Sequence, residues 1–301
     1  MKQLVAVNGF LLLIFFNFAI HAQTQFKWTT GGGSVTDFSA LPSQENEQTK
    51  FMCTDVNGNV YALSQVGIDP VTADTFHGTA VGGDYQNTLL TSYNCNGQMR
   101  WAKLISSGSE CIPHFIVTDN AGHLYVLGSF THLGDLLHIG YDTTLVAPTY
   151  QPEMLIQFDT SGHYNWLRYI GDNSPATNGA FGYSVLAIDG NNNAHFFAYM
   201  RHGVHITPSL TSIGGTYDLV YNPAGSLLST IRVDLDSQWY FNDAVIDPIT
   251  NKLYVSGQIN QSIYGGFLTD TFFAAHLIVE GICCGNIFAD MVMMMALLVL
   301  L

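Results

Sequence analysis

Residues 116–129, IVTDNAGHLYVLGS, decide how this chain folds, because two apolar runs flank one short polar turn at Asp119. Apolar runs of this length, bounded by Asx and Gly residues, are typical of a β-hairpin. The same pattern occurs four times, with its aspartates spaced 64, 70 and 58 residues apart, at Asp55, Asp119, Asp189 and Asp247. Self-similarity at such a period predicts a repeat architecture.

A second hairpin pattern alternates with the first. Residues 88–101, TLLTSYNCNGQMRW, are matched by residues 154–166 and 218–230. In each copy an Asx residue is followed three positions later by Gly and four further on by Trp or Ser: Asn94, Gly97 and Trp101; Asp159, Gly162 and Trp166; Asn222, Gly225 and Ser229. One repeat therefore holds two hairpins, or four strands, which is the content of a β-propeller blade.

The recurring Asx and Gly residues carry the chemistry of turns. An Asx side chain accepts hydrogen bonds from the backbone ahead of it, and Gly adopts the positive φ that tight hairpins need. We therefore assign these residues structural roles. The repeated tryptophans, Trp28, Trp101 and Trp166, are expected to fill the apolar layers between neighbouring blades.

These features resemble a known family. The stretch GSFTHLGDLLHIGYDTTLVAPTYQPEMLIQFDTSGHYNWLRYIG, residues 128–171, is similar to the SBBP-type β-propeller repeat of bacteria that use type IX secretion. The shared marks are the YVLGSF strand end, a variable loop with Asp and Gly, an apolar strand ending in Asp-x-x-Gly, and a Trp four residues beyond. The resemblance spans roughly residues 26–277. It implies an exported propeller and says little about function, because the shared residues are structural.

The two ends of the chain differ from the repeat. Residues 1–22 have a basic start, an apolar run and a small residue at Ala22, which predicts a signal peptide, with a membrane anchor as the alternative. Residues 278–301 end in eleven uninterrupted apolar residues, fewer than the roughly 20 that span a membrane. We therefore expect no stable membrane span, a repeat domain over residues 23–277, and an aberrant tail over 278–301.

The repeat is incomplete at both ends. FFAAHL, residues 272–277, matches the strand that precedes an Asx-x-x-Gly turn, but no such turn follows it. The first repeat, in turn, begins at Trp28 without that strand, so the two pieces could pair within one blade. The sequence predicts a propeller of about four or five four-stranded blades. A ring that stays open at the C-terminus, as part of a larger propeller, is the alternative.

The charge balance limits the partners. Lys and Arg number 9 against 23 Asp and Glu, a formal net charge of −14, so a nucleic-acid backbone would be repelled. With 48% hydrophobic residues the chain can still build a packed core. We expect an extracellular protein or a glycan as the partner, and neither nucleic acid nor an anionic membrane surface.

Five cysteines in an exported chain raise the question of disulfides. Cys95 is expected in the turn between a blade's first two strands and Cys111 at the start of the third, about 20 Å away for six residues at roughly 3.3 Å each. These two are therefore not expected to bridge, and Cys53 is expected to be a small buried hydrophobe. The redox state of Cys53, Cys95, Cys111, Cys283 and Cys284 stays open.

Two groups of residues are candidates for metal ligands. His202 and His205 form the closest histidine pair, but no third ligand or HExxH pattern accompanies them. Asp189, Asn191 and Asn193 copy the first ligands of a calcium loop, yet the sixth and twelfth positions hold Ala and Met instead of Gly and Glu. A turn is favoured over a calcium site at Asp189, and no cofactor is predicted.

The sequence favours binding over catalysis. It contains no G-x-S-x-G motif, and loops at 132–151, 202–216 and 261–271 vary while the strands stay alike. We interpret the chain as a secreted or cell-surface propeller that acts as a non-catalytic binding, adhesion or scaffold module. The alternatives are a glycan-active hydrolase or lyase on a propeller and a truncated fragment of a longer cell-surface protein.

Overall fold

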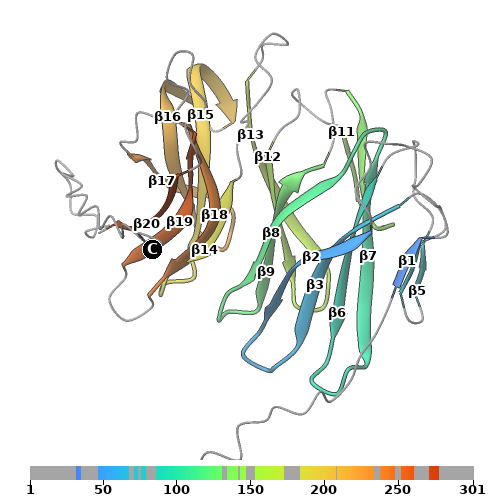
Figure 1. Ribbon diagram of the computed structural model, residues 1–301. Helices are drawn as coiled ribbons and strands as arrows, with labels where there is room; N and C mark the ends of the chain where they lie inside the picture. The colour runs from blue at the N-terminus through green and yellow to red at the C-terminus, as the bar shows by residue number, and fades with distance from the viewer. Residues whose placement is uncertain are drawn as a thin grey trace, which may run out of the picture. The chain divides into compact units, whose positions relative to one another are not determined.

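The computed structural model (Figure 1) describes residues 32–34, 47–67, 71–73, 76–78, 86–130, 134–141, 143–146, 153–172, 184–207, 209–233, 238–247, 252–260 and 271–277. The chain divides into two compact units, Met1–Thr30 and Gly31–Leu301, and every element named below belongs to the second. In the described ranges every regular element is a β-strand in an antiparallel sheet. The all-β prediction is therefore confirmed.

Three runs of four strands, called here the first, second and third meanders, carry most of the fold. The first meander consists of β2 (Gln48–Thr54), β3 (Val60–Val66), β6 (Asn87–Tyr93) and β7 (Met99–Ser107). The second consists of β8 (Ile112–Thr118), β9 (His123–Ser129), β12 (Glu153–Asp159) and β13 (Tyr164–Asp172). The third consists of β14 (Val185–Ile188), β15 (Ala194–Thr207), β16 (Ser209–Tyr221) and β17 (Leu227–Val233). A three-stranded sheet follows, of β18 (Gln238–Ile246), β19 (Leu253–Asn260) and β20 (Thr271–Leu277).

The middle strands of the meanders are apolar on both faces. Four consecutive residues of β9, Leu124 to Leu127, are all 0% exposed, which requires cover on both sides of the sheet. One buried cluster joins the first and second meanders, and a second cluster joins the second and third. We call these contacts the first and second interfaces, and that between the third meander and β18–β19–β20 the third interface.

The first strand of each meander contacts the first strand of the next: β2 contacts β8, β8 contacts β14, and β14 contacts β18. The sheet continues beyond the last strand of the first and second meanders. In each case, residues from the second and third strands of the following meander, or from the segment between them, pair with that last strand. β10 (Leu136–Ile139), which lies between β9 and β12, pairs with β7 and with β11 (Thr143–Val146). The far end of β15 pairs with β13 in the same way. The sheets formed by these pairings are open.

The additions recur at a fixed distance from the repeated tryptophans. β10 pairs with residues 105–107, which follow Trp101 by four to six positions, and β15 pairs with residues 171 and 172, five and six positions after Trp166. β1 (Gly32–Ser34), four to six positions after Trp28, pairs with β4 (Val71–Ala73), which pairs with β5 (Phe76–Gly78). β1 thus occupies the sequence position of the end of a fourth strand.

Two sequence expectations need correction. Cys95 lies in the turn between β6 and β7, the third and fourth strands of the first meander, and Cys111 precedes β8 in the second. Each meander therefore begins with the hairpin of a recurring aspartate, and the hairpin of the Asn94 type comes second, because β8 pairs with β9 and not with β7. Cys53, Cys95 and Cys111 are free, and Cys111 is buried. Residues 202–216, expected as a loop, form the far ends of β15 and β16.

FFAAHL forms β20, as expected for a strand, and pairs with β19. The pairing predicted with the N-terminal half-repeat involves Trp28, which lies outside the described residues. Residues 1–22, most of the loop at 261–271, and residues 278–301 with Cys283 and Cys284 also lie outside them. Within the described part of the chain, no helix is long and apolar enough to cross a membrane.

Candidate functional site

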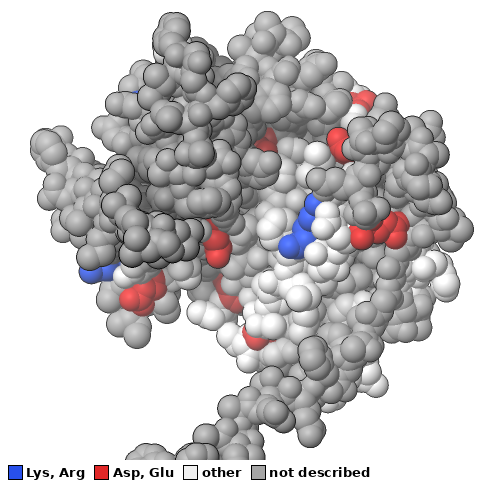
Figure 2. All heavy atoms as spheres, viewed as in Figure 1, with Lys and Arg blue, Asp and Glu red and all other residues white. Residues whose placement is uncertain are grey.

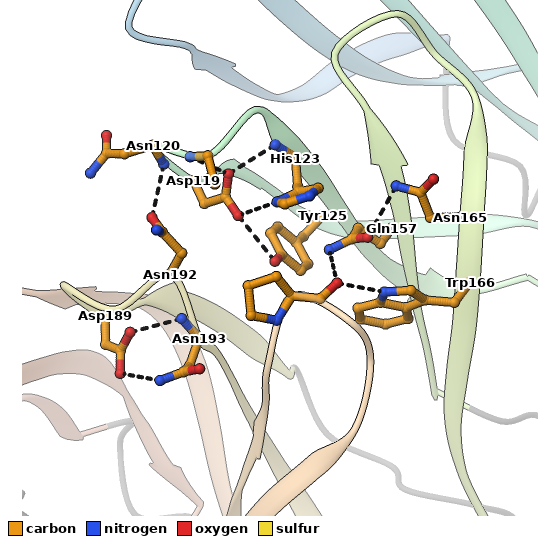
Figure 3. Close-up of polar contacts among 12 residues, drawn as sticks. Asp119, Asn120, His123, Tyr125, Gln157, Asn165, Trp166, Asp189, Asn192 and Asn193 are labelled. Atoms are coloured by element: carbon orange, nitrogen blue, oxygen red, sulfur yellow. Dashed lines mark hydrogen bonds and ion pairs between the residues drawn. The ribbon is translucent and has the colours of Figure 1, made fainter.

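The carboxylates of the recurring aspartates accept hydrogen bonds from residues of their own turns. Asp119 Oδ1 accepts the backbone N–H groups of Ala121 and His123 at 2.9 and 2.8 Å, while Oδ2 lies 2.7 Å from His123 Nδ1 (Figure 3). The Tyr125 hydroxyl donates to the same Oδ2 at 3.2 Å. Asp55 makes the same set of contacts with Asn57, Asn59 and Tyr61. These carboxylates lie in the turns that join the two strands of a hairpin, and they have few lone pairs left for a ligand.

The calcium-loop candidate at Asp189 is also such a turn. Asn191 and Asn193 donate their backbone N–H groups to Asp189 Oδ1, both at 2.8 Å, and Asn193 Nδ2 donates to Oδ2 (Figure 3). Asn192 adopts a positive φ of 64° and accepts the Asn120 N–H at 3.1 Å, which joins the turns of the second and third meanders. The asparagines therefore act mainly as donors to the carboxylate.

Burial opposes ionisation of these carboxyl groups, yet their hydrogen bonds outweigh it. The pKa of Asp55 lies below its ordinary value, because Asn59, Tyr61 and Asn57 all donate to it. Hydrogen bonds from His195, Asn193 and Asn191 lower the pKa of Asp189 to about 2 despite its burial. Both groups are therefore anionic at neutral pH, as turn acceptors should be.

The second set of turns carries the repeated glycines. Asn94, Asp159 and Asn222 each accept backbone N–H groups through Oδ1, and the glycines three positions later have φ of 80°, 87° and 76° at Gly97, Gly162 and Gly225. Positive φ is a conformation that Gly adopts without cost. The remaining turn, at Asp247, is closed by a backbone bond from its N–H to the Lys252 carbonyl at 2.9 Å.

The repeated tryptophans join neighbouring meanders. Trp101 Nε1 donates to the Thr160 carbonyl at 3.0 Å, and Trp166 Nε1 donates to the Pro223 carbonyl at 3.0 Å, so each reaches the last turn of the next meander (Figure 3 shows the second). A Cβ on Gly162 would lie 2.8 Å from the Trp101 ring, and one on Gly225 would lie 2.9 Å from the Trp166 ring. We call this pair of interactions the Trp–turn contact.

A buried cluster that the sequence did not single out lies in the third meander. His195 Nδ1 is 2.8 Å from Asp218 Oδ2, and His195 Nε2 is 3.6 Å from Asp189 Oδ2. His195 and Asp218 are 6% and 1% exposed. A sequence signal did exist, because His195 stands six residues after the turn aspartate, where the first two repeats have Tyr61 and Tyr125.

A second polar cluster lies at the opposite end of the strands. His114 Nδ1 is 3.0 Å from Glu153 Oε2, and the Ser129 hydroxyl donates to Glu153 Oε1 at 3.0 Å. Burial would lower the pKa of His114, but the Glu153 charge and hydrogen bond outweigh it and raise the pKa above its ordinary value. Glu153 is 2% exposed, so this pair can hold a proton but offers little surface to a ligand.

Only one side chain of the histidine pair considered from the sequence is described. His202 is exposed on β15, and the side chain of His205 lies outside the described residues. No group of three or more His, Cys, Asp or Glu side chains in the described ranges is arranged to hold a metal ion. On the face drawn in Figure 2, the described acidic side chains are scattered and Lys and Arg are few.

Comparison with known proteins adds no relative: no family model matches the chain, and no curated protein matches it. The arrangement of turns, connections and interfaces is therefore the basis for a function.

Proposed function

We propose that this chain is an exported, non-catalytic β-propeller of the SBBP type that acts as a binding, adhesion or scaffold module. Its partner is an extracellular protein or glycan, held by the long connections at one end of the strands. The observation that carries the proposal is the separation, in the first and second meanders, of short turns at one end of the strands from long connections at the other; in the third meander the long strands β15 and β16 are joined at that other end by one residue.

The propeller itself is supported by three regularities. First strands of successive meanders contact one another in order, each meander is a run of four antiparallel strands within a larger sheet, and the two Trp–turn contacts link neighbours in the same direction. Sheets packed face to face around their first strands are the arrangement of blades in a propeller. The position of β1 after Trp28 supports a fourth strand for the sheet β18–β19–β20.

The two ends of the strands differ in connection length. Because consecutive antiparallel strands reverse direction, the first and third turns of a meander lie at one end, and the second connection lies at the other. Turns at the first end have four or five residues, from 119–122 to 55–59. Connections at the second end reach 20 residues between β3 and β6 (67–86) and 23 between β9 and β12 (130–152). Long, variable connections on a rigid scaffold are where binding residues concentrate.

The β10–β11 hairpin presents apolar side chains at that second end. Leu136 and Val146 pair across it and are 49% and 65% exposed, and Tyr141 at its tip is 78% exposed. Its other face is anchored, because Leu137 and Ile139 belong to the buried cluster of the first interface. An exposed Tyr on an anchored hairpin supplies contact area at a low entropic cost.

Binding to immobilised polysaccharides and extracellular matrix proteins tests this proposal. We expect Tyr141→Ala to weaken binding of whichever probe is captured by at least about tenfold, since central aromatic residues dominate interfaces. Val56→Ala is the matched control, because Val56 is 72% exposed but lies in a tight turn at the opposite end. Equal effects of the two substitutions would refute binding at the long connections.

The enzymatic alternative is tested on the same polysaccharides by measuring released reducing ends. His114 and Glu153 are the ionisable pair at the end with the long connections. Cleavage that is lost in Glu153→Gln would replace the binding module with a glycan-active enzyme.

A further inference from the structure

The third meander breaks the repeat at its face toward β18–β19–β20. Cross-strand register aligns Tyr61 with Trp101 through Ser92, and Tyr125 with Trp166 through Gln157. The same row in the third meander holds His195 and Ser229, joined through Val220. In the neighbouring row, Asp218 stands where the first two meanders have Leu90 and Leu155. Tyr, Trp and Leu are thus replaced by His, Ser and Asp.

This polar face belongs to the third interface. The other side of β16 carries Tyr217 and Leu219, which pack against the second meander in the buried cluster of the second interface. Asp218 lies between these two along the strand, so its side chain points the opposite way. β14 and β16 also contact β18. Because the opposite side of β16 packs against the second meander, we infer that β18 lies on the side of Asp218.

The ion pairs at this face link separate strands. His195 on β15 contacts Asp218 on β16 at 2.8 Å and Asp189, after β14, at 3.6 Å. The imidazole ring is also stacked on Phe197, with ring centroids 6.2 Å apart and planes 16° apart. A protonated His195 therefore holds two carboxylates, which would repel each other without it.

The face is also short of hydrogen bonds. Thr216 Oγ1, Asp218 Oδ1 and Ser229 Oγ are buried and have no hydrogen-bond partner among the residues that the structure describes. Register places all three on the same side of the sheet, since Thr216 is two residues from Asp218 and Ser229 pairs with Val220. Buried polar atoms without partners weaken packing. We therefore infer that the ion pairs of His195 contribute a larger share of the stability of the third interface than the corresponding residues contribute in the first and second interfaces.

Other ionisable groups near this face are few in the described part of the chain. Tyr199 lies on the same side of β15, whereas Arg232 on β17 pairs with Tyr217 and so lies on the other side of the sheet. β18 and β19 contribute Asp243 and Tyr254, both exposed. β20 contributes His276, whose side chain lies outside the description.

We propose that the third interface is a pH-responsive joint, which opens when His195 loses its proton while the first and second interfaces stay closed. Deprotonation leaves Asp189 and Asp218 facing each other across a neutral ring, and no Trp–turn contact from Ser229 replaces the lost attraction. Opening would separate the third meander from β18–β19–β20.

The pKa of His195 determines the direction in which the stability of the third interface changes with pH. Burial lowers this pKa, but the bonds and charges of Asp189 and Asp218 outweigh burial and raise it from 6.5 to about 9. Stabilisation by the imidazolium is therefore complete below pH 6.5 and is lost as the pH rises through 9. The pKa of Asp218 is raised chiefly by burial, while the hydrogen bond and charge of His195 lower it, so loss of the imidazolium removes the group that favours the Asp218 carboxylate.

Amide hydrogen exchange of the full chain between pH 7 and pH 10, corrected for the intrinsic rate, tests the joint. We expect protection of β14–β19 amides to fall roughly 10- to 100-fold, since one unit of pKa shift corresponds to tenfold in the opening constant. Amides of β6, β7 and β9 should change far less. In His195→Gln the third interface should be weakly protected at both pH values.

His163→Gln is the matched control, because His163 makes the same contact with Asp159 at 3.0 Å but in an exposed turn. It should behave like the wild type. His195→Tyr combined with Asp218→Leu, the residues of the second meander, should fold and lose the pH dependence. Uniform loss of protection in all meanders, or wild-type pH dependence in either His195 variant, would overturn the proposal.

Discussion

The second and third interfaces occupy the same register positions and use opposite chemistry. At the second interface, Trp166 packs against Tyr125 with ring centroids 6.0 Å apart and seals the turn at Gly225. At the third, His195 holds two carboxylates, and the Ser229 hydroxyl has no partner within the described ranges. Apolar contacts do not depend on pH, whereas ion pairs do. The comparison shows that a repeat can conserve its backbone and still vary the strength and chemistry of each interface.

The largest expected effect separates the two interfaces by truncation. Trp101→Ala and Trp166→Ala should each lower the free energy of unfolding by about 3–5 kcal/mol, because each removes a large packed ring. Ser229→Ala, at the same register position, should change it by less than about 0.5 kcal/mol, since its hydroxyl bonds to no residue in the described part of the chain. Urea unfolding monitored by circular dichroism measures all three.

Urea unfolding also tests the role of Trp28. If the chain closes as a propeller, the strand with Trp28 completes the sheet β18–β19–β20 and Gly97 is the receiving turn. Trp28→Ala should then cost about as much as Trp101→Ala. A cost near zero for Trp28→Ala would indicate an open arrangement.

A smaller effect is expected from the glycine under the ring. Gly225→Ala places a Cβ 2.8 Å from Arg168 Nη2 and 2.9 Å from the Trp166 ring at a φ of +76°, so it combines a steric clash with backbone strain. We expect a loss of about 2–3 kcal/mol. Gly134→Ala is the control, because its φ is +85° with nothing within 4 Å of the added Cβ, and strain alone should cost about 1 kcal/mol. Equal losses would mean that the ring contact contributes nothing.

The smallest expected effect is the loss of stability at low pH that comes from Asp189. The pKa of Asp189 falls from 3.8 to about 2 through hydrogen bonds that outweigh its burial, so its stabilisation exists above pH 3.8 and is lost as the pH falls through 2. The urea midpoint should therefore drop between pH 6 and pH 2.5 less steeply in Asp189→Asn than in the wild type. Burial raises the pKa of Asp159, but hydrogen bonds from His163 and Ser161 outweigh it and lower this pKa as well. Because its turn is more exposed, Asp159→Asn should flatten the slope less than Asp189→Asn does. An unchanged slope in Asp189→Asn would assign the acid sensitivity to other groups.

Much of the local structure was predictable. The hairpins at Asp55, Asp119 and Asp189 follow from apolar runs around an Asx turn, since turn chemistry acts over only four or five residues. The candidate calcium loop at Asp189 also reads correctly as a turn. The His195–Asp218 pair was missed, because 23 residues separate its members and only the pairing of β15 with β16 brings them together.

The sequence by itself determined the strands, the tight turns and the positions of the repeated tryptophans, because these depend on alternation and local hydrogen bonding. Only the tertiary structure decided which hairpins share a sheet, that Trp101 and Trp166 reach the turn of the next meander, and that His195 bridges two aspartates. Such contacts depend on strand register and on the packing of separate sheets. His195 and Asp218 form an ion pair because the pairing of β15 with β16 places them side by side in a buried face.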